Sequence, residues 1–197
     1  GMRFLLATGN LHKKKEVSDI LSPLGYEIVT PRDLGLAFDP EETGATLEEN
    51  ALLKAREGLR LTGLGTIADD SGLCVEAIQG RPGIYSARYG GEDLPFEQKI
   101  QLLLQELDGK TDRRAYFICA IACLLPDGRE ITVQGRCDGE IAYAPSGANG
   151  FGYDPIFRVL GKGCTFAQLT EEEKNRISHR SRALAALEQK LKEELPL

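Results

Sequence analysis

Two adjacent carboxylates stand out in the stretch TIADDSGLCVEA, residues 66–77. Asp69 and Asp70 lie between two short apolar runs, and burying either charge without a partner costs several kcal/mol. Because Asp, Ser and Gly are common turn residues, this stretch alone favours a hairpin turn over a cation site. If a strand instead ends at the two aspartates, their side chains face opposite ways. One carboxylate would then face a site and the other would make structural hydrogen bonds.

A second acidic segment, DPEETG at residues 39–44, lies in a stretch that has the composition of a loop. Glu42 in this segment is a candidate metal ligand. Mg²⁺ prefers one or two carboxylates together with waters and substrate phosphate oxygens. A pair made of Glu42 with Asp69 or Asp70 would meet that requirement.

Basic residues follow a turn near the beginning of the chain, in LATGNLHKKKEV at residues 6–17. Thr8, Gly9 and Asn10 precede Lys13, so the pattern is that of a turn that leads into a helix. Backbone N–H groups at a helix start, with a lysine one turn later, form a seat for phosphate. The motif lacks the Walker pattern G-x-x-x-x-G-K-[ST], and the two lysines after Lys13 are better explained as a solvated helix face.

A glycine-rich segment, GANGFGYDP at residues 147–155, contains G-x-x-G-x-G, which is not the order of the dinucleotide-binding fingerprint. Its glycines would let the backbone approach a flat ligand, with Phe151 or Tyr153 stacking on it and Asp154 accepting hydrogen bonds. The alternative is a tight turn packed by aromatic residues.

Lysine, histidine and arginine come together in EEEKNRISHRSRALAAL, residues 171–187. In one unbroken helix Lys174 and His179 would lie about 140° apart, on different faces. If Ser178 caps a new helix, His179 and Arg180 fall in its first turn, where a bound anion is favoured. A cationic helix surface is the alternative.

The elements that position these residues alternate between strands and helices. Thr46 and Glu49 form a capping box at the start of one helix. The sequence PDGR between two apolar runs indicates an antiparallel hairpin. We expect strands at 3–8, 26–30, 66–70, 115–125, 130–142 and 156–159, helices within 11–24, 46–59, 96–107 and 171–191, and loops at 31–46, 80–83 and 145–155. This pattern predicts a single α/β domain over residues 1–197 with a mixed sheet.

Composition limits the classes of partner. The chain has 197 residues, enough for one domain with room for two lobes, and its net charge of −6 argues against sequence-blind nucleic-acid binding. Neither an apolar run of membrane-spanning length nor a signal peptide is evident, and we expect Gly1 to be a remnant of an expression tag. The five cysteines show no zinc-ligand spacing and are expected to be core residues in the cytoplasm.

Six motifs occur in a fixed order along the chain: ATGNxxK, EETGxTxxENAxxKA, ADDSGL, RPGIYSARYGG, GxNGFGYDPIF and EEKNxISHRSxAL. With them the sequence resembles the inosine triphosphate pyrophosphatase family, and in particular the bacterial dITP/XTP pyrophosphatases, from about Phe4 to Leu187. The Maf-type nucleotide pyrophosphatases share the fold of that family, but this sequence resembles them much less.

The resemblance implies Mg²⁺-dependent hydrolysis of non-canonical purine nucleoside triphosphates (dITP, ITP and XTP) to the monophosphate and pyrophosphate. It also implies an elongated two-lobed α/β fold around a central mixed, twisted sheet with flanking helices, and a homodimer in the cytoplasm. The expected partner is a free purine nucleoside triphosphate, with no nucleic acid and no membrane. Two alternatives remain: a Maf-like pyrophosphatase of modified or canonical nucleotides, and a non-catalytic nucleotide sensor, which would not need Glu42 and Asp70.

Roles carried over by motif make Asp70 the proton acceptor and Glu42 with Asp70 the metal ligands. Glu41 is the alternative to Glu42, because the alignment there is ambiguous by one residue. Arg88 is a looser assignment, since its position varies in type within the family. The residues expected to bind the substrate are Thr8, Gly9, Asn10, Leu11, His12, Lys13, Lys54, Ser71, Arg88, Phe151, Gly152, Tyr153, Asp154, Lys174, His179 and Arg180. Of these, the cations Lys13, Lys54, Lys174 and Arg180 would neutralise the triphosphate.

Overall fold

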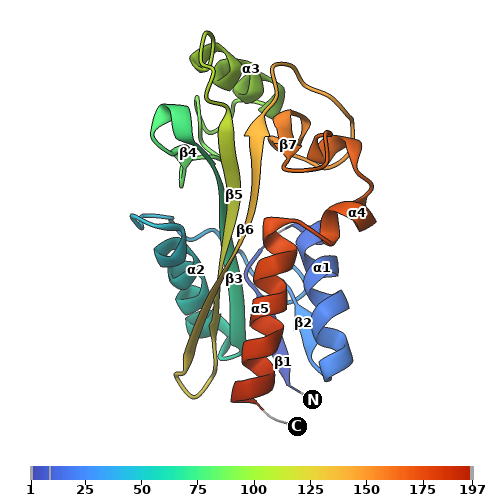
Figure 1. Cartoon of the computed structure of the whole chain (residues 1–197). Helices are drawn as coiled ribbons and strands as arrows, with labels where there is room; N and C mark the ends of the chain where they lie inside the picture. Colours follow the sequence, from blue (N-terminus) through green and yellow to red (C-terminus); the bar gives the residue numbers. More distant parts are fainter. Residues whose placement is uncertain (1, 9, 196–197) are drawn as a thin grey trace. The chain divides into compact units, whose positions relative to one another are not determined.

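The computed structural model describes residues 2–8 and 10–195 and has the α/β architecture that the sequence predicts (Figure 1). Contacts divide the chain into two compact units, each described here by itself. Unit 1 comprises Gly1–Asp70, Cys119–Gly135 and Ser181–Leu197, and unit 2 comprises Ser71–Ile118 and Arg136–Arg180.

The strands of the described chain form a seven-stranded mixed sheet, as predicted. Its order is β2-β1-β3-β5-β6-β7, with β4 paired to β3. Strand β1 is parallel to β2 and β3, whereas β4 is antiparallel to β3 and β7 is antiparallel to β6. The strands are β1 (Arg3–Leu6), β2 (Glu27–Val29), β3 (Gly65–Val75), β4 (Arg81–Gly83), β5 (Arg114–Leu124), β6 (Glu130–Ile141) and β7 (Phe157–Val159).

The predicted helical regions are also found, as α1 (Leu11–Leu21), α2 (Leu47–Thr62), α3 (Phe96–Glu106), α4 (Glu171–Asn175) and α5 (His179–Glu194). Thr46 caps α2 as expected, because its hydroxyl accepts from the Glu49 N–H at 3.0 Å. The Glu49 carboxylate, however, accepts from the Ala45 N–H at 2.6 Å and does not return to Thr46. No helix within residues 2–8 and 10–195 is long and apolar enough to cross a membrane.

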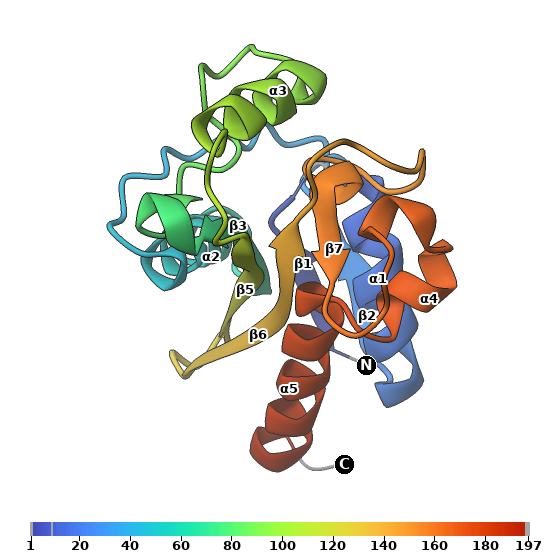
Figure 2. The ribbon, with the colours of Figure 1, turned by 45° about the horizontal axis from the view of Figure 1, so that its top comes forward.

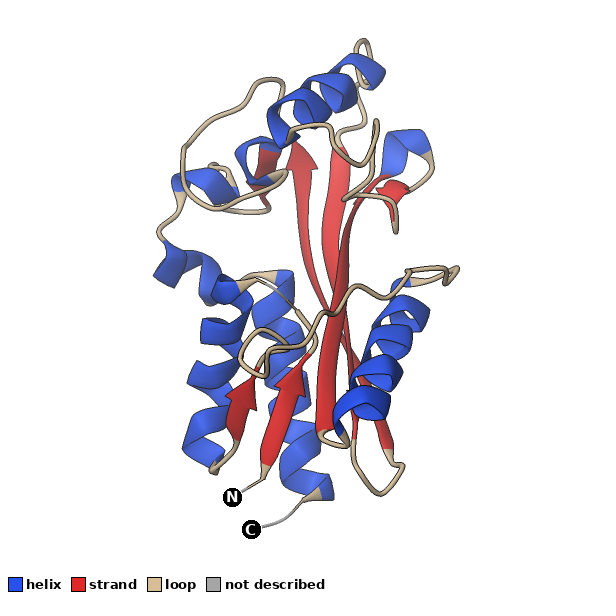
Figure 3. Cartoon of the chain, turned by 180° about the vertical axis from the view of Figure 1, so that it is seen from behind, coloured by secondary structure: helices blue, strands red, loops and turns tan. Residues whose placement is uncertain are grey.

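In unit 1, helices cover both faces of the sheet (Figures 1 and 3). Along β3 the side chains alternate, so Ile67 packs in a cluster with Leu21 of α1 and Leu187 of α5. The next residue, Ala68, packs in a second cluster with Ala55 of α2. Consecutive residues of β3 are thereby aimed at different helices, and this alternation continues into the two aspartates.

Unit 2 has its own apolar core, formed by the beginning of β5, the end of β6, α3 and β7, and Figure 2 shows these elements. The ring of Phe117 on β5 lies 4.6 Å from that of Phe157 and 5.7 Å from that of Phe166, measured between centroids. In the described chain all five cysteines are free thiols, and Cys119, Cys123 and Cys137 are buried, in line with the prediction that cysteines are core residues.

Three predictions of local structure are wrong. The hairpin turn at Asp69–Asp70 does not exist, because β3 runs without a break from Gly65 to Val75. The expected loop at residues 80–83 contains the short strand β4, which follows a turn at Gln79 and Gly80. The apolar periodicity from residue 177 to 191 does not belong to one helix, because Ile177 lies in the turn between α4 and α5 and packs against the core of unit 2.

Candidate active site

Asp69 points from β3 toward α1. The Lys13 ammonium lies 3.2 Å from its Oδ1 and 3.1 Å from its Oδ2, and the Asp69 residue is only 7% exposed. The thiol of Cys119, on the neighbouring strand, is 4.0 Å from Oδ2. Asp69 is therefore the aspartate that forms a buried ion pair with Lys13, and that only one of the two aspartates faces a site stays a prediction.

Asp70 points the other way, toward α2. The Asn50 side chain donates from Nδ2 to Asp70 Oδ2 at 3.1 Å, and its Oδ1 accepts from the Gly44 N–H at 2.7 Å. Asn50 is buried and so connects Asp70 with the loop that precedes α2. Asn50 is not among the site residues expected from the sequence, although Asn50 and Lys54 have the i, i+4 spacing of one helix face.

Lys54, one turn after Asn50, brings the acidic segments together. Its ammonium donates to the backbone oxygen of Asp69 at 2.5 Å and forms an ion pair with Glu42 Oε1 at 2.7 Å. Burial alone would lower the pKa of Lys54, but Asp69, Glu42 and Asp70 together outweigh burial and raise it. Lys54 is therefore a firmly held positive charge among three carboxylates.

The pKa of Asp70 is raised to about 6. Burial is the main cause, and the nearby charges of Glu42 and Asp69 add to it, while Lys54 and the hydrogen bond from Asn50 oppose it. Two ammonium groups, on Lys13 and Lys54, face three carboxylates here, so the group carries one excess negative charge. Such a group of hard oxygen ligands fits a divalent cation.

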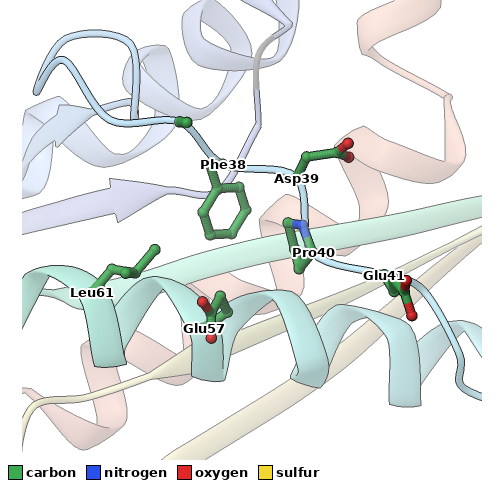
Figure 4. A pocket seen from close by; sticks show the side chains of 7 residues that line it. Phe38, Asp39, Pro40, Glu41, Glu57 and Leu61 are labelled. Carbon is green, nitrogen blue, oxygen red and sulfur yellow. The ribbon is translucent and has the colours of Figure 1, made fainter.

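Glu42, and not Glu41, is the glutamate that lies beside Lys54 and Asp70. Glu41 instead lines a pocket of about 320 Å³ between the loop and α2, together with Phe38, Glu57 and Leu61 (Figure 4). Apart from Glu41, the alternative to Glu42, none of the residues expected to bind substrate or metal lines this pocket. In the described part of the chain no group of three or more His, Cys, Asp or Glu side chains is arranged to hold a metal, so a metal here would need oxygens from water or substrate.

The expected phosphate seat lies at the start of α1. Asn10 caps this helix: its side chain accepts from the N–H groups of His12 at 2.9 Å and Lys13 at 3.4 Å. The Asn10 N–H in turn donates to the Thr8 hydroxyl at 3.2 Å. A phosphate that binds these N–H groups must therefore displace the Asn10 side chain. Leu11, the first residue of α1, is largely exposed, and Gly9 lies outside the described residues.

Ser71 follows Asp70 directly on β3. Its hydroxyl oxygen is buried and has no hydrogen-bond partner within the described chain. Buried polar atoms in proteins are nearly always hydrogen-bonded. An orphaned hydroxyl beside Asp70 is therefore an observation in favour of a ligand at this point.

In unit 2 the glycine-rich loop is organised around a buried carboxylate. Asp154 Oδ2 accepts from the Phe151 N–H at 3.1 Å and forms an ion pair with the Lys174 ammonium at 2.6 Å. Gly150 has a φ of +72°, and any Cβ there would collide with the Asp154 carboxylate. The loop conformation thus requires both the glycine and the acid.

Of the two aromatic residues in this loop, Phe151 is the exposed one. Its ring is about half-exposed, with the Lys174 ammonium 4.6 Å and the Arg180 guanidinium carbon 5.6 Å from its centroid. Tyr153, which follows Gly152, is buried against Phe96, so its ring is not open to a stacking ligand. Phe151 is therefore the ring that the structure makes available.

Helix α5 begins at His179, and α4 ends at Asn175, so the interrupted helix is found and the unbroken one is excluded. His179 and Arg180 consequently occupy the first turn of α5, and both are buried. The His179 ring stacks on Phe117, with centroids 4.7 Å apart and an interplanar angle of 14°.

The three lysines expected to neutralise a triphosphate each have a carboxylate partner: Lys13 with Asp69, Lys54 with Glu42, and Lys174 with Asp154. Sequence reasoning identified the cations but missed these partners, because each pair joins residues that are distant in the sequence. The predicted residues thus form two groups. Unit 1 holds Thr8, Asn10, Leu11, His12, Lys13, Glu42, Lys54 and Asp70, and unit 2 holds Ser71, Arg88, Phe151, Gly152, Tyr153, Asp154, Lys174, His179 and Arg180.

Comparison with known proteins gives consistent matches over almost the whole chain. Residues 4–190 match the model of the Ham1 family. A Treponema denticola protein named dITP/XTP pyrophosphatase is 50% identical over 194 residues, which cover 97% of this chain and 99% of that protein. A Bacillus subtilis protein with the same name is 46% identical, with 93% of each chain covered.

The solved structure of the Staphylococcus aureus Ham1 protein is also similar, with a TM-score of 0.91 and 44% identity, covering 98% of this chain and 99% of that one. The family resemblance and the fold class predicted from the sequence are therefore confirmed. This chain belongs to the Ham1 family.

Proposed function

We propose that this chain hydrolyses non-canonical purine nucleoside triphosphates, such as dITP and XTP, to the monophosphate and pyrophosphate. The family match and the relatives named dITP/XTP pyrophosphatase support this activity. The structural observation that carries it is the partly buried Asp70, whose pKa is raised to about 6 next to Glu42 and Lys54. In the reaction, the oxygen of water bonds to the α-phosphorus while the bond from that phosphorus to the bridging oxygen of the pyrophosphate breaks.

Asp70 is the proposed proton acceptor. A carboxylate with a pKa of about 6 is largely ionised at neutral pH, and it is more basic than an ordinary aspartate. The hydrogen bond from Asn50 fixes one of its oxygens, Oδ2, so the carboxylate is held in one orientation toward an attacking water.

We assign Mg²⁺ as the cofactor, with Glu42 and Asp70 as its protein ligands. The excess negative charge of the unit 1 group supports this assignment, as does the preference of Mg²⁺ for few carboxylates plus water and phosphate oxygens. When bound, the ion supplies charge neutralisation for the phosphates and lowers the pKa of a coordinated water. Lys54, which is paired with Glu42 in the metal-free chain, would then turn toward a phosphate.

The unit 1 residues would bind the triphosphate. Lys13 and Lys54 supply positive charge, and Ser71, at the start of unit 2, supplies the hydroxyl that lacks a partner. In the first turn of α1, the backbone N–H groups of His12 and Lys13 donate to the Asn10 side chain. In the complex they would donate to phosphate oxygens instead. Further residues assigned to this role are Thr8, Gly9, Leu11 and His12.

The unit 2 residues would bind the purine base. Phe151 offers an exposed ring for stacking, flanked by Lys174 and Arg180. Donors from Arg180 or the backbone would recognise the 6-oxo group that hypoxanthine and xanthine carry in place of the amino group of adenine. Further residues assigned to the substrate are Arg88, Gly152, Tyr153, Asp154 and His179, of which Asp154 acts by holding Lys174 and the loop.

The decisive experiment measures released pyrophosphate from ITP, dITP, XTP, GTP and ATP with Mg²⁺. We expect turnover of the first three at much higher kcat/KM than of GTP or ATP. Equal turnover of ATP would instead favour a pyrophosphatase of canonical nucleotides, and binding without turnover would favour a nucleotide sensor. Repeating the assay with excess chelator tests the metal.

We further propose that the protein is a homodimer and works in the cytoplasm, where its free nucleotide substrates are found. Light scattering of the purified protein measures its mass directly. A mass of about 43 kDa, twice the 21.5 kDa of the chain, is expected for the dimer.

A further inference from the structure

Unit 2 contains a fully buried lysine that the proposed mechanism does not use. Lys99 on α3 is 1% exposed, and its ammonium donates to the backbone oxygens of Tyr89 at 2.8 Å and Gly91 at 2.6 Å. The ring of Phe96 lies 5.8 Å from the same ammonium. Within the described chain no carboxylate forms an ion pair with Lys99.

Burying this ammonium is costly. Its neighbours on α3, Ile100 and Leu103, belong to the apolar core of unit 2. Removing an ammonium from water costs several kcal/mol, and an apolar side chain of similar volume in such a place is often neutral or stabilising. Core packing therefore does not explain a lysine here, whereas the need to hold two particular carbonyl groups does.

The two carbonyls belong to a loop, residues 84–91, which follows β4 and consists of consecutive tight turns. The Arg88 N–H donates to the Tyr85 oxygen at 2.9 Å, and the Gly91 N–H donates to the Arg88 oxygen at 2.9 Å. Gly90 has a φ of +76°, and a Cβ there would collide with Leu102 and Leu94. The backbone thus turns tightly over α3, and Lys99 holds the carbonyls on both sides of Gly90.

The same loop is fixed at its other end by Ser86. The Ser86 hydroxyl accepts from the Leu73 N–H of β3 at 2.9 Å and donates to the Gly83 oxygen at 2.6 Å. The Tyr153 hydroxyl donates to the Ser86 oxygen at 2.6 Å, and the Tyr153 ring packs edge-on against Phe96 at 5.2 Å. One network of contacts therefore joins the loop to the glycine-rich segment that presents Phe151.

Between these two anchors the loop presents Arg88, and Tyr85 directly precedes the Ser86 anchor. Tyr85 is 57% exposed, and the Arg88 guanidinium carbon lies 5.2 Å from the centroid of its ring. No carboxylate of the described chain pairs with Arg88. An arginine on a backbone that is already fixed loses little further freedom when it binds an anionic ligand, so rigidity of the loop adds directly to affinity.

We infer that Lys99 is a positioning residue for the substrate: by holding the carbonyls of Tyr89 and Gly91 it fixes the loop so that Arg88 is aimed at an anionic part of the nucleotide. This inference rests on the proposed function, in which Arg88 contacts the substrate. Lys99 itself is buried and touches no ligand, so its effect must pass through Arg88.

A double-mutant cycle tests this path. We expect Lys99→Met to raise the KM for ITP about tenfold while kcat stays within about twofold, the pattern of lost ground-state binding. Arg88→Ala should raise KM by a similar factor. The double variant should be no worse than Arg88→Ala alone, because residues that act through one another are not additive. Lys99→Arg, which keeps the donors, should retain a KM near that of the wild type.

Lys110→Met is the matched control, since it removes an exposed lysine from the same unit and should leave KM unchanged. Circular dichroism and thermal unfolding confirm that each variant is folded. If Lys99→Met does not fold, Lys99→Gln takes its place in the cycle; its shorter side chain cannot reach the carbonyls of both Tyr89 and Gly91, so the same rise in KM is expected.

Three outcomes overturn the inference. An unchanged KM in the folded Lys99 variant, with a raised KM in Arg88→Ala, would reduce Lys99 to a purely structural residue. Additive effects in the double variant would show that Lys99 acts elsewhere, and an unchanged KM in Arg88→Ala would remove Arg88 from the substrate. Failure of the proposed function looks different, because the wild-type protein itself would then release no pyrophosphate from ITP.

Discussion

Asp70 of unit 1 and Asp154 of unit 2 lie in opposite electrostatic settings. In unit 1, Asp70 shares its surroundings with the carboxylates of Glu42 and Asp69, and its pKa is raised to about 6. In unit 2, Asp154 is more deeply buried, only 3% exposed, and it receives an ion pair from Lys174 and a hydrogen bond from the Phe151 N–H. Asp70 thus has two carboxylates and one ammonium group as charged neighbours, whereas Asp154 is paired with an ammonium group.

This difference distinguishes a carboxylate suited to catalysis, Asp70, from one with a structural role, Asp154. Asp154 stabilises a loop conformation and keeps Lys174 beside an exposed ring. Asp70 is destabilised as an anion, which makes it a better proton acceptor and an acceptor for a cation. The same substitution, aspartate to asparagine, should therefore have opposite consequences in the two units.

The largest effect is expected on turnover. Asp70→Asn removes the proposed proton acceptor and a proposed metal ligand, so kcat for ITP should fall by ~10²–10⁴. Steady-state assays of pyrophosphate release with saturating Mg²⁺ measure it. Asp154→Asn, in a protein that stays folded, should change KM more than kcat. Near-normal turnover by Asp70→Asn with metal still bound would contradict the assignment of Asp70.

Next in size is the effect of Asp154→Asn on stability. It leaves the Lys174 ammonium, whose side chain is 12% exposed, without a charged partner. We expect the free energy of unfolding to fall by about 2–4 kcal/mol, somewhat less than for complete loss of a buried partner, because asparagine still accepts hydrogen bonds. Urea denaturation measures the change. Asp19→Asn, in the exposed pair with Lys15, is the control and should show no measurable loss.

Asp70→Asn should instead raise the free energy of unfolding when a chelator is present. Because the folded-state pKa of about 6 lies above the ordinary value of 3.8, the folded state binds protons more tightly than the unfolded chain. The contribution of Asp70 to stability is therefore fully present below pH 3.8 and is lost as pH rises through about 6. Above that pH the variant should be more stable than the wild type by roughly 1–3 kcal/mol, and near pH 4 the two should converge.

Thermal unfolding of the wild type and Asp70→Asn with a chelator, at pH values on both sides of the pKa of about 6, measures this difference in stability. Mg²⁺ should then raise the melting temperature of the wild type more than that of Asp70→Asn, since only a ligand of the folded state stabilises it. A pH-independent difference between the two proteins would mean that Asp70 is not the group whose charge is penalised.

Many of the elements in this comparison could be predicted from the sequence, because they depend on residues that are close together in the chain. The helices and the β5–β6 hairpin follow from apolar periodicity and turn residues, and the order of the motifs led to the family. The interruption between Lys174 and His179 was one of two interpretations, since Ser178 begins a helix as readily as it sits inside one.

What the sequence did not give are the partners that chains acquire only by folding. Asp69 and Asp70 looked like a turn because their like charges disfavour burial, and the lysine and the asparagine that make burial possible come from α1 and α2. The role of Lys99 was equally hidden. A lysine on an amphipathic helix is expected to be exposed, and only the folded structure shows that the loop at Tyr89 covers Lys99.

The smallest expected effect concerns the exposed ring of unit 2. If Phe151 stacks on the purine, Phe151→Ala should raise the KM for ITP about fivefold, at the low end of the ~1–3 kcal/mol range for stacking of a base on an aromatic side chain. The ring is already about half-exposed, so little packing is lost and the protein should stay folded. Because stacking is the same in the ground state and the transition state, kcat should hardly change.

Phe151→Tyr is the matched control, because it keeps a ring between Lys174 and Arg180 and should retain most of the affinity. Inorganic triphosphate provides a second control: it has no base, so its inhibition constant should be the same for the wild type and Phe151→Ala. If the alanine variant loses affinity for triphosphate as well, Phe151 acts by holding the cations Lys174 and Arg180 and not by stacking. The assignment of Phe151 to the purine base would then be wrong, because the ring would act on phosphate binding through Lys174 and Arg180.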